Sequence, residues 1–358
     1  MVERLDALEL DPQQILQLCV VVSKTSIADV FAKILHSGRG NFTLHESELA
    51  PGPSDVSQFR IRRKLGRKFP RSLEGEFLIA PTGYRDTHLL VWIEPARFWH
   101  DVIAPFVGSL YPTLVRPFYT QPEMHGFLKN VQNEGRSVRI LRLNSRERLR
   151  LPGSRKRYAS DLRWTDSDID SAFSSARQEN VWFKSIAFEL VREVKERLVS
   201  EDIKATISKN AYFSCTRSFA QFFRSIVEPM VRIGHERLVF FGNRDRRATS
   251  FAGPRPVKIR YDSDIFNTAE QTKKLLEAMK RFKHGTCSVL HANPYLHVSV
   301  VDNYDNSCAD VWVLAKSEIL IVPQIKTSDA ALERVVNHIF EHFREGTIAE
   351  DKITQASV

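Results

Sequence analysis

The residue types best suited to chemistry lie near the C-terminal end of the chain. Asp310 begins one apolar segment with the pattern of a strand, and Gln324 and Lys326 end the next such segment. A carboxylate, an amide and an amine at the ends of neighbouring strands can take part in metal-dependent chemistry. Asp310, Gln324 and Lys326 are therefore the candidates for chemistry in this region.

This arrangement resembles the metal-dependent nucleases of the PD-(D/E)xK type. In that family an Asp lies on one strand, and Glu-x-Lys, or in some members Gln-x-Lys, lies on the neighbouring strand. Here the resemblance rests on Asp310 and on Gln324-Ile325-Lys326, over less than a tenth of the chain. It implies a nucleic-acid-cleaving enzyme that uses Mg²⁺, with Asp310, Gln324 and Lys326 as catalytic residues. In that family the carboxylate, here Asp310, is the metal ligand, and the lysine positions and polarises the attacking water. Without that activity, the sequence indicates no particular cofactor.

The pairing register of the two strands decides whether these groups meet. With a three-residue hairpin loop Asp310 would lie opposite Gln324, and with a two-residue loop it would lie opposite Pro323 while the lysine points away. Proline within a strand usually marks a sheet edge, which departs from the family's pattern. A plain hairpin with polar ends is the alternative interpretation.

The histidines of this region give a weaker indication of metal binding. His338 and His342 match the H-x-x-E-H string of inverted zinc peptidases. That family needs a further glutamate well downstream, and only sixteen residues follow His342. His291 and His297 precede several aspartates, but their spacing matches no zinc or calcium pattern.

Basic residues gather in three arginine-rich segments. Residues 60–71 contain seven basic side chains and no acid, residues 136–157 contain nine basic side chains and one acid, and a third group begins at Arg244. Arginine contacts phosphate in bidentate fashion, so these segments favour nucleic acid, DNA or RNA, as a partner. The alternative is a set of solvated loops whose arginines pair with acids elsewhere. The side chains predicted to bind nucleic acid are Arg60, Arg62, Arg63, Lys64, Arg67, Lys68, Arg71, Arg146, Arg148, Arg150, Arg155, Lys156, Arg157, Arg244, Arg246 and Arg247.

Composition places the chain among folded proteins with a basic balance. Of 358 residues, 42% are hydrophobic and 27% are charged, and 52 Lys and Arg against 43 Asp and Glu give a net charge of +9. Such a balance favours polyanionic partners. The four cysteines are too widely spaced for a zinc knuckle or a disulfide framework. We expect a cytoplasmic protein without membrane insertion, because the first residues lack the pattern of a secretory signal or a membrane span.

The elements that must position these residues alternate between helices and strands, which predicts an α/β (mixed α+β) fold. Residues 1–50 are expected to form a helical segment that can dock a partner protein. Residues 55–150 are expected to form an N-terminal α/β domain of a mixed sheet with flanking helices. Residues 160–350 are expected to form a C-terminal α/β domain that ends in three strands and a helix. No internal repeat is evident.

Three hypotheses of function follow from these patterns. The leading one is a nucleic-acid-binding protein that uses its arginine clusters, set in a prokaryotic assembly for genome maintenance or defence. The second is the metal-dependent nuclease described above. The third is a non-catalytic scaffold or assembly subunit. No P-loop, dinucleotide-binding or nucleophile-elbow motif is present, which argues against those classes of enzyme.

Overall fold

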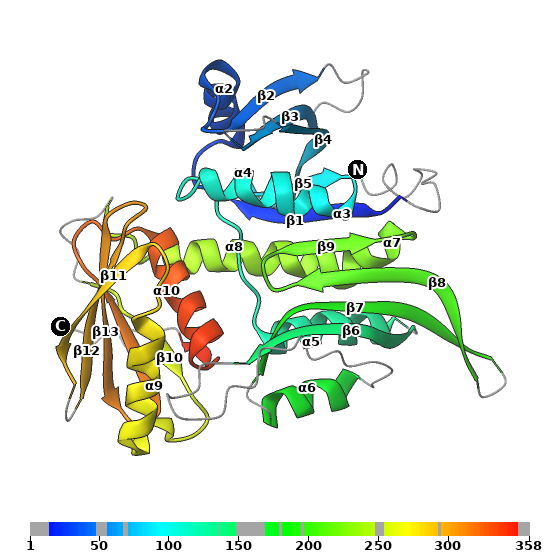
Figure 1. Cartoon of the computed structure of the whole chain (residues 1–358). Coiled ribbons are helices and arrows are strands. Elements are labelled where there is room, and N and C mark those ends of the chain that lie inside the picture. The colour runs from blue at the N-terminus through cyan, green and yellow to red at the C-terminus, as the bar shows by residue number, and fades with distance from the viewer. Residues whose placement is uncertain are drawn as a thin grey trace, which may run out of the picture. The chain divides into compact units, whose positions relative to one another are not determined.

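The computed structural model divides the chain into two compact units, each described here by itself (Figure 1). Unit 1 comprises Met1–Glu147 and Tyr158–Arg237, and unit 2 comprises Arg148–Arg157 and Leu238–Val358. The protein is mixed α/β, with two antiparallel sheets and several helices. The structure describes residues 14–47, 56–66, 71–134, 136–147, 169–178, 181–194, 197–247, 254–292 and 295–349.

Unit 1 is built on a nine-stranded antiparallel sheet in the order β2-β3-β4-β5-β1-β9-β8-β7-β6. Its strands are β1 (Leu16–Val22), β2 (Phe42–Ser47), β3 (Ser57–Leu65), β4 (Arg71–Pro81), β5 (Thr87–Trp92), β6 (Ser137–Glu147), β7 (Val181–Val194), β8 (Arg197–Ser208) and β9 (Tyr212–Cys215). Its helical elements are α2 (Ile27–Ser37), α3 (Ala96–Phe98), η1 (Trp99–Ile103), α4 (Ala104–Ser109), α5 (Gln121–Asn133), α6 (Ile169–Gln178), α7 (Phe219–Phe222), η2 (Phe223–Val227) and α8 (Glu228–Gly242), which continues past the end of the unit.

The two halves of unit 1 repeat the same succession of elements, which corrects the expectation of no internal repeat. In the first half α2 is followed by β2 to β5 and then by the helix α3–η1–α4. In the second half α5 is followed by β6 to β9, with α6 inserted, and then by α7–η2–α8. Strands β5 and β9 pair with the two opposite edges of β1. The two meanders therefore extend to either side of this central strand (Figure 1).

The closing helix of each half contains a π-helical turn at the same position. In each turn, η1 and η2, the next backbone N–H donates to the carbonyl five residues earlier. A proline comes one residue later. Pro105 and Pro229 lie 124 positions apart, at the same place in the aligned strings FWHDVIAPFV and FFRSIVEPMV. Proline has no N–H, and its ring crowds the carbonyl four residues back, so a widened turn before it is the expected relief.

The helices of the two halves cover opposite faces of the sheet. In the first half Phe31 of α2 packs against Phe77 of β4, with ring centroids 6.2 Å apart. In the second half Phe222 of α7 packs against Phe213 of β9 at 5.6 Å. The pairing register across β4, β5, β1 and β9 places Phe77 on the same face as Tyr212. Phe213 is the next residue after Tyr212, so it points to the other face.

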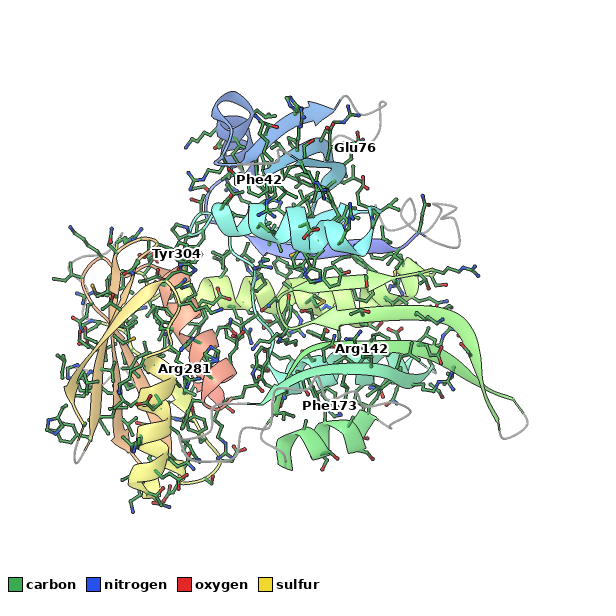
Figure 2. The ribbon with its side chains drawn as sticks, in the orientation of Figure 1. Phe42, Glu76, Arg142, Phe173, Arg281 and Tyr304 are labelled. Carbon is green, nitrogen blue, oxygen red and sulfur yellow. The ribbon has the colours of Figure 1, made fainter. Side chains whose placement is uncertain are left out.

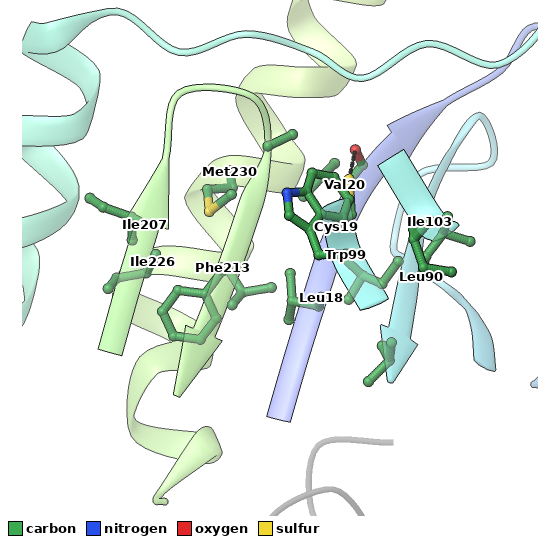
Figure 3. Packing of buried hydrophobic residues seen from close by; sticks show 14 of the residues in the cluster. Leu18, Cys19, Val20, Leu90, Trp99, Ile103, Ile207, Phe213, Ile226 and Met230 are labelled. Atoms are coloured by element: carbon green, nitrogen blue, oxygen red, sulfur yellow. Dashed lines mark hydrogen bonds between the residues drawn. The ribbon is translucent and has the colours of Figure 1, made fainter. Parts of the chain in front are cut away.

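Strand β1 lies at the centre of the sheet, which corrects the expectation of a helical segment over residues 1–50. Its sequence LQLCVVV is buried throughout, because the strand has neighbours on both edges and side chains packed on both faces. A continuous apolar run does not distinguish a buried helix from a strand buried on both faces, and the valines favour the strand. Figure 3 shows Leu18 with Phe213, Ile226 and Met230 around the junction of β1 and β9.

One helix within the expected helical segment is confirmed, since α2 begins after Ser26. Residues 42–47, expected to be helical, form β2 instead. Residues 1–13 lie outside the described part of the chain. Docking of a partner protein by this region stays a prediction.

Unit 2 contains a six-stranded antiparallel sheet in the order β11-β12-β13-β14-β10-β15. The three strands predicted near the C-terminus are confirmed as β12, β13 and β14, and the helix that follows is confirmed as α10. No helix among the described residues is long and apolar enough to cross a membrane. The elements are β10 (Val257–Arg260), η3 (Ile265–Asn267), α9 (Ala269–Met279), β11 (Gly285–His291), β12 (Leu296–Asp302), β13 (Ser307–Ala315), β14 (Glu318–Pro323), α10 (Asp329–His342) and β15 (Thr347–Ala349).

The expected domain boundary near residue 150 falls in 148–168, outside the described residues. Residues 169–237 belong to unit 1. The reason is β9, which pairs with β1 and so joins these residues to the N-terminal half of the chain.

Candidate nucleic-acid interface

Strand β3 carries the first basic segment and sorts its side chains between two faces. Arg60, Arg62 and Lys64 are exposed, whereas Phe59 and Ile61 are buried against the helices of the first half. Alternation along a strand therefore sets the three cations on the face opposite α2 and α4, about 6.7 Å from one to the next. We call Arg60, Arg62 and Lys64 the β3 cation row.

Arg63 is separated from this row because it points toward the helices. Its guanidinium donates to the backbone carbonyl of Asp101 and lies over the ring of Phe42, 5.4 Å from the centroid. Arg71 begins β4 opposite Leu65 and is exposed. Arg67 and Lys68, between β3 and β4, lie outside the described residues.

Two glutamates of β4 lie beside the β3 cation row, a feature that the sequence analysis missed. Glu76 pairs in register with Arg60, and Glu74 pairs with Arg62. Arg60 donates through Nε and Nη2 to Glu76 Oε1, at 3.0 and 2.7 Å. Its Nε also lies 3.8 Å from Glu74 Oε1. The alternating Glu-Gly-Glu of residues 74–76, just beyond a short connection from the basic segment, is the signal that could have revealed this pairing.

The Arg60–Glu76 contact shifts the ionisation of both groups. The hydrogen bond from Arg60 lowers the pKa of the Glu76 carboxyl, and a second bond from Gln58 acts in the same direction. The hydrogen bond to Glu76 and its negative charge raise the pKa of Arg60. Both groups are therefore charged at neutral pH and hold each other in a defined orientation.

The second basic segment is described only in part. On β6, Arg139 donates to the buried carboxylate of Glu189, with Nε 2.5 Å from Oε1, and this guanidinium is therefore engaged inside unit 1. Arg142 is exposed on the same strand (Figure 2). Arg146 pairs in register with Trp182 of β7. The remaining predicted residues, outside the described part of the chain, are Arg148, Arg150, Arg155, Lys156 and Arg157.

The third basic segment makes contacts within unit 2. The guanidinium of Arg244 lies 3.5 Å from the ring centroid of Phe240. Arg246 donates to a backbone carbonyl at the end of β14, 3.3 Å away. Arg247 forms an ion pair with Asp305, with Nη2 3.2 Å from Oδ2. These contacts engage all three guanidinium groups in the fold of unit 2.

The candidate hydrolytic residues are brought together in part. Asp310 lies on β13 and pairs in register with Val322, so neither predicted hairpin register occurs. The cause is a register shift between Trp312 and Ala315 near the turn. Gln324 lies two residues beyond Val322 and reaches diagonally, with its Nε2 donating to Asp310 Oδ2 at 2.8 Å.

Lys326 does not lie on the strand, because β14 ends at Pro323. It occupies a turn with a left-handed φ of 67°, and its side chain is exposed. His297 of β12 is a third neighbour of Asp310, with Nε2 3.4 Å from Oδ2, and its ring stacks on Trp312. The catalytic role of these residues stays a prediction.

The nuclease resemblance implies a metal ion at Asp310, and among the described residues Asp310 is the carboxylate that could bind it there. Mg²⁺ prefers oxygen ligands, usually carboxylates that leave room for several waters. One oxygen of Asp310 already accepts from Gln324, and the next neighbour is the imidazole of His297. Among the described residues, no group of three or more His, Cys, Asp or Glu side chains could hold a metal ion. The described residues at this place therefore do not fit a Mg²⁺ site.

His338, the first histidine of the H-x-x-E-H string, is a packing residue between α9 and α10. It is 8% exposed, and its Nε2 lies 2.7 Å from the carbonyl oxygen of Ala278. Its ring meets Phe282 edge-on at 5.1 Å. Burial lowers the pKa of His338, against smaller opposing effects of the Ala278 carbonyl and Glu341, while Arg334 adds to the lowering.

The free energy of unfolding of unit 2 should therefore decrease as the pH is lowered below about 6.5. The folded state keeps His338 neutral, whereas the unfolded chain takes up a proton at its ordinary value of 6.5. The unfolded state then binds more protons, so acidification through this window favours unfolding. Replacing His338 with Gln, which can still donate to Ala278, should reduce the loss of melting temperature between pH 7.5 and pH 5.5. The same change at the exposed His291 should leave that loss as it is in the parent, and an equal effect at both positions would contradict the assignment.

Comparison with known proteins indicates no function, so a function must be argued from the arrangement of the residues described above. No protein-family model matches the chain, and no curated protein matches it at a significant level of similarity.

Proposed function

We propose that this protein binds nucleic acid through the β3 cation row. The supporting observation is the sorting of a basic segment along one strand, with Arg60, Arg62 and Lys64 exposed on the same face. The row has a regular spacing set by the strand. Regularly spaced cations on a rigid sheet suit the repeating charge of a phosphate backbone.

Contacts of this kind position a nucleic acid without reading its sequence. Arg and Lys side chains that meet phosphates release bound counterions, which supplies affinity and makes it dependent on salt. The row is a single file, so it matches one phosphate backbone lying along β3. Phosphates are shared by DNA and RNA, and both are ligands under this proposal.

The proposal is tested by measuring the affinity for a labelled oligonucleotide of mixed sequence at several salt concentrations. Binding should weaken as salt increases. Replacing Arg62 and Lys64 together with Ala should weaken binding roughly tenfold at low salt and reduce the slope of log affinity against log salt by about 1.4 to 1.8, the value for two lost phosphate contacts.

The matched control is Arg281→Ala with Lys283→Ala in unit 2. These residues are also an exposed Arg and Lys two positions apart, so the variant loses the same charge (Figure 2 labels Arg281). Its affinity and salt slope should equal those of the parent protein. Absence of binding at low salt, or equal losses in the two variants, would refute the proposal.

A further inference from the structure

We propose that Glu76 acts as an internal competitor of phosphate for Arg60 and so limits the affinity of the β3 cation row. The inference rests on the proposed function, since it concerns how that interface is regulated. In the absence of a ligand, the carboxylate of Glu76 occupies the guanidinium that a phosphate would use.

The geometry of the contact supports this competition. Nε and Nη2 of Arg60 both donate to the same oxygen, Glu76 Oε1. These two atoms form one edge of the guanidinium fork, the kind of edge that binds phosphate oxygens in bidentate fashion. The other oxygen of Glu76 accepts from Gln58 Nε2 at 2.6 Å. Gln58 thereby holds the carboxylate against Arg60 (Glu76 is labelled in Figure 2).

The pair is also exposed enough to be opened by a ligand. The Arg60 side chain is 54% exposed and that of Glu76 is 38% exposed. Exposed ion pairs contribute little net stability, so a phosphate can replace the carboxylate without disturbing the sheet. The negative charge of Glu76 nevertheless stays close to the ligand and opposes it.

The other members of the row are held differently. Arg62 pairs in register with Glu74, yet it donates to Ser72 Oγ, at 3.4 Å. Glu74 lies nearer to Arg60, at 3.8 Å from its Nε. The acids of β4 therefore converge on Arg60. In the parent protein Arg62 and Lys64 therefore provide the phosphate contacts. Arg60 can contact phosphate only when Glu76 releases its guanidinium.

The test is Glu76→Gln, which keeps the size of the side chain and one acceptor oxygen and removes the charge. Oligonucleotide binding at low salt should become about twofold to fivefold tighter, the range expected when one exposed opposing charge is removed. The slope of log affinity against log salt should steepen by about 0.7 to 0.9, because Arg60 then contributes one additional phosphate contact.

Two control variants distinguish competition at Arg60 from a simple change of net charge. Glu228→Gln removes the same charge from an exposed site in α8 and should leave affinity and slope unchanged. Adding Glu76→Gln to Arg60→Ala should produce a smaller gain in affinity than Glu76→Gln alone and no change in slope, because only the through-space repulsion by Glu76 is then removed. Tighter binding in Glu228→Gln, or an undiminished gain in the Arg60→Ala background, would overturn the inference.

The inference and the proposed function fail in different ways. Absence of salt-dependent binding by the parent protein rejects the proposed function itself. If the parent binds, and binding depends on Arg62 and Lys64, but Glu76→Gln has the parent's affinity and slope, only the role of Glu76 is rejected. Circular dichroism and melting of each variant establish that the fold is retained.

Discussion

Replacing Arg237 with Met should lower the free energy of unfolding of unit 1 by about 3 kcal/mol, the lower end of the range for breaking a buried ion pair. The guanidinium is buried, and its Nη2 lies 2.7 and 2.6 Å from the two carboxylate oxygens of Glu123. It also lies over the ring of Phe118, 4.0 Å from the centroid. Methionine fills the space but leaves the carboxylate without its counter-ion. Urea unfolding, monitored through the hydrogen exchange of α5, measures this change in the free energy of unfolding.

Two further variants determine whether the loss comes from the charge. Adding Glu123→Gln to Arg237→Met should recover at least about 1 kcal/mol, because no uncompensated charge then remains. Glutamine also preserves the capping box that Glu123 forms with Thr120 at the start of α5. Arg232→Ala, at an exposed pair with Glu236 in the same helix, should cost no more than about 0.5 kcal/mol. A loss of similar size at both arginines would refute the buried-pair explanation.

Replacing Asp305 with Ala should lower the free energy of unfolding of unit 2 by about 3 kcal/mol. This carboxylate connects the β12–β13 turn to the start of α10. It accepts from Ser328 Oγ at 2.5 Å and from the backbone N–H of Ser307 at 3.0 Å, and it pairs with Arg247. Ser328 also caps α10, so the helix loses part of its anchor. Hydrogen exchange of β12, β13 and α10 in increasing urea reports the loss.

The control for Asp305 is Asp262→Ala, which removes an exposed carboxylate of the same unit. Its effect should stay within about 0.5 kcal/mol. Asp305→Asn should lie between the two, because it keeps the size and one acceptor but loses the charge. If Asp305→Ala is as stable as Asp262→Ala, the contacts of Asp305 do not anchor α10, and its ion pair with Arg247 does not stabilise unit 2.

The arginines that form three clusters in the sequence have different roles in the structure. Arg63 and Arg247 make contacts within their own units, the first with a backbone carbonyl and an aromatic ring and the second with a carboxylate. Arg62 is exposed on the face of β3 opposite α2 and α4. A local count of charge cannot separate these roles, because orientation depends on which face of the strand the core covers.

Local sequence patterns predicted those helices and strands whose own residues carry a clear apolar periodicity. The helix α10 follows the predicted apolar periodicity, and β12, β13 and β14 follow the predicted strands.

Features that depend on how strands pair could not be predicted from local sequence patterns. The strand β1 was expected to be helical, and its identity follows from its neighbours β5 and β9, the second of which is almost two hundred residues away. The hairpin of β13 and β14 was expected in one of two registers, and a local shift produced a third. Register is decided by packing and turn geometry, which the residue pattern does not encode.

For this protein the sequence by itself determined the mixed α/β class, the basic balance and the position of the basic segments. These properties depend on composition and on the period of the side chains along the chain. Only the tertiary structure decided which members of the first basic segment face solvent and that Glu76 is the partner of Arg60. The physical reason is that strand pairing brings β4 against β3, and the helices α2 and α4 select the face that is buried.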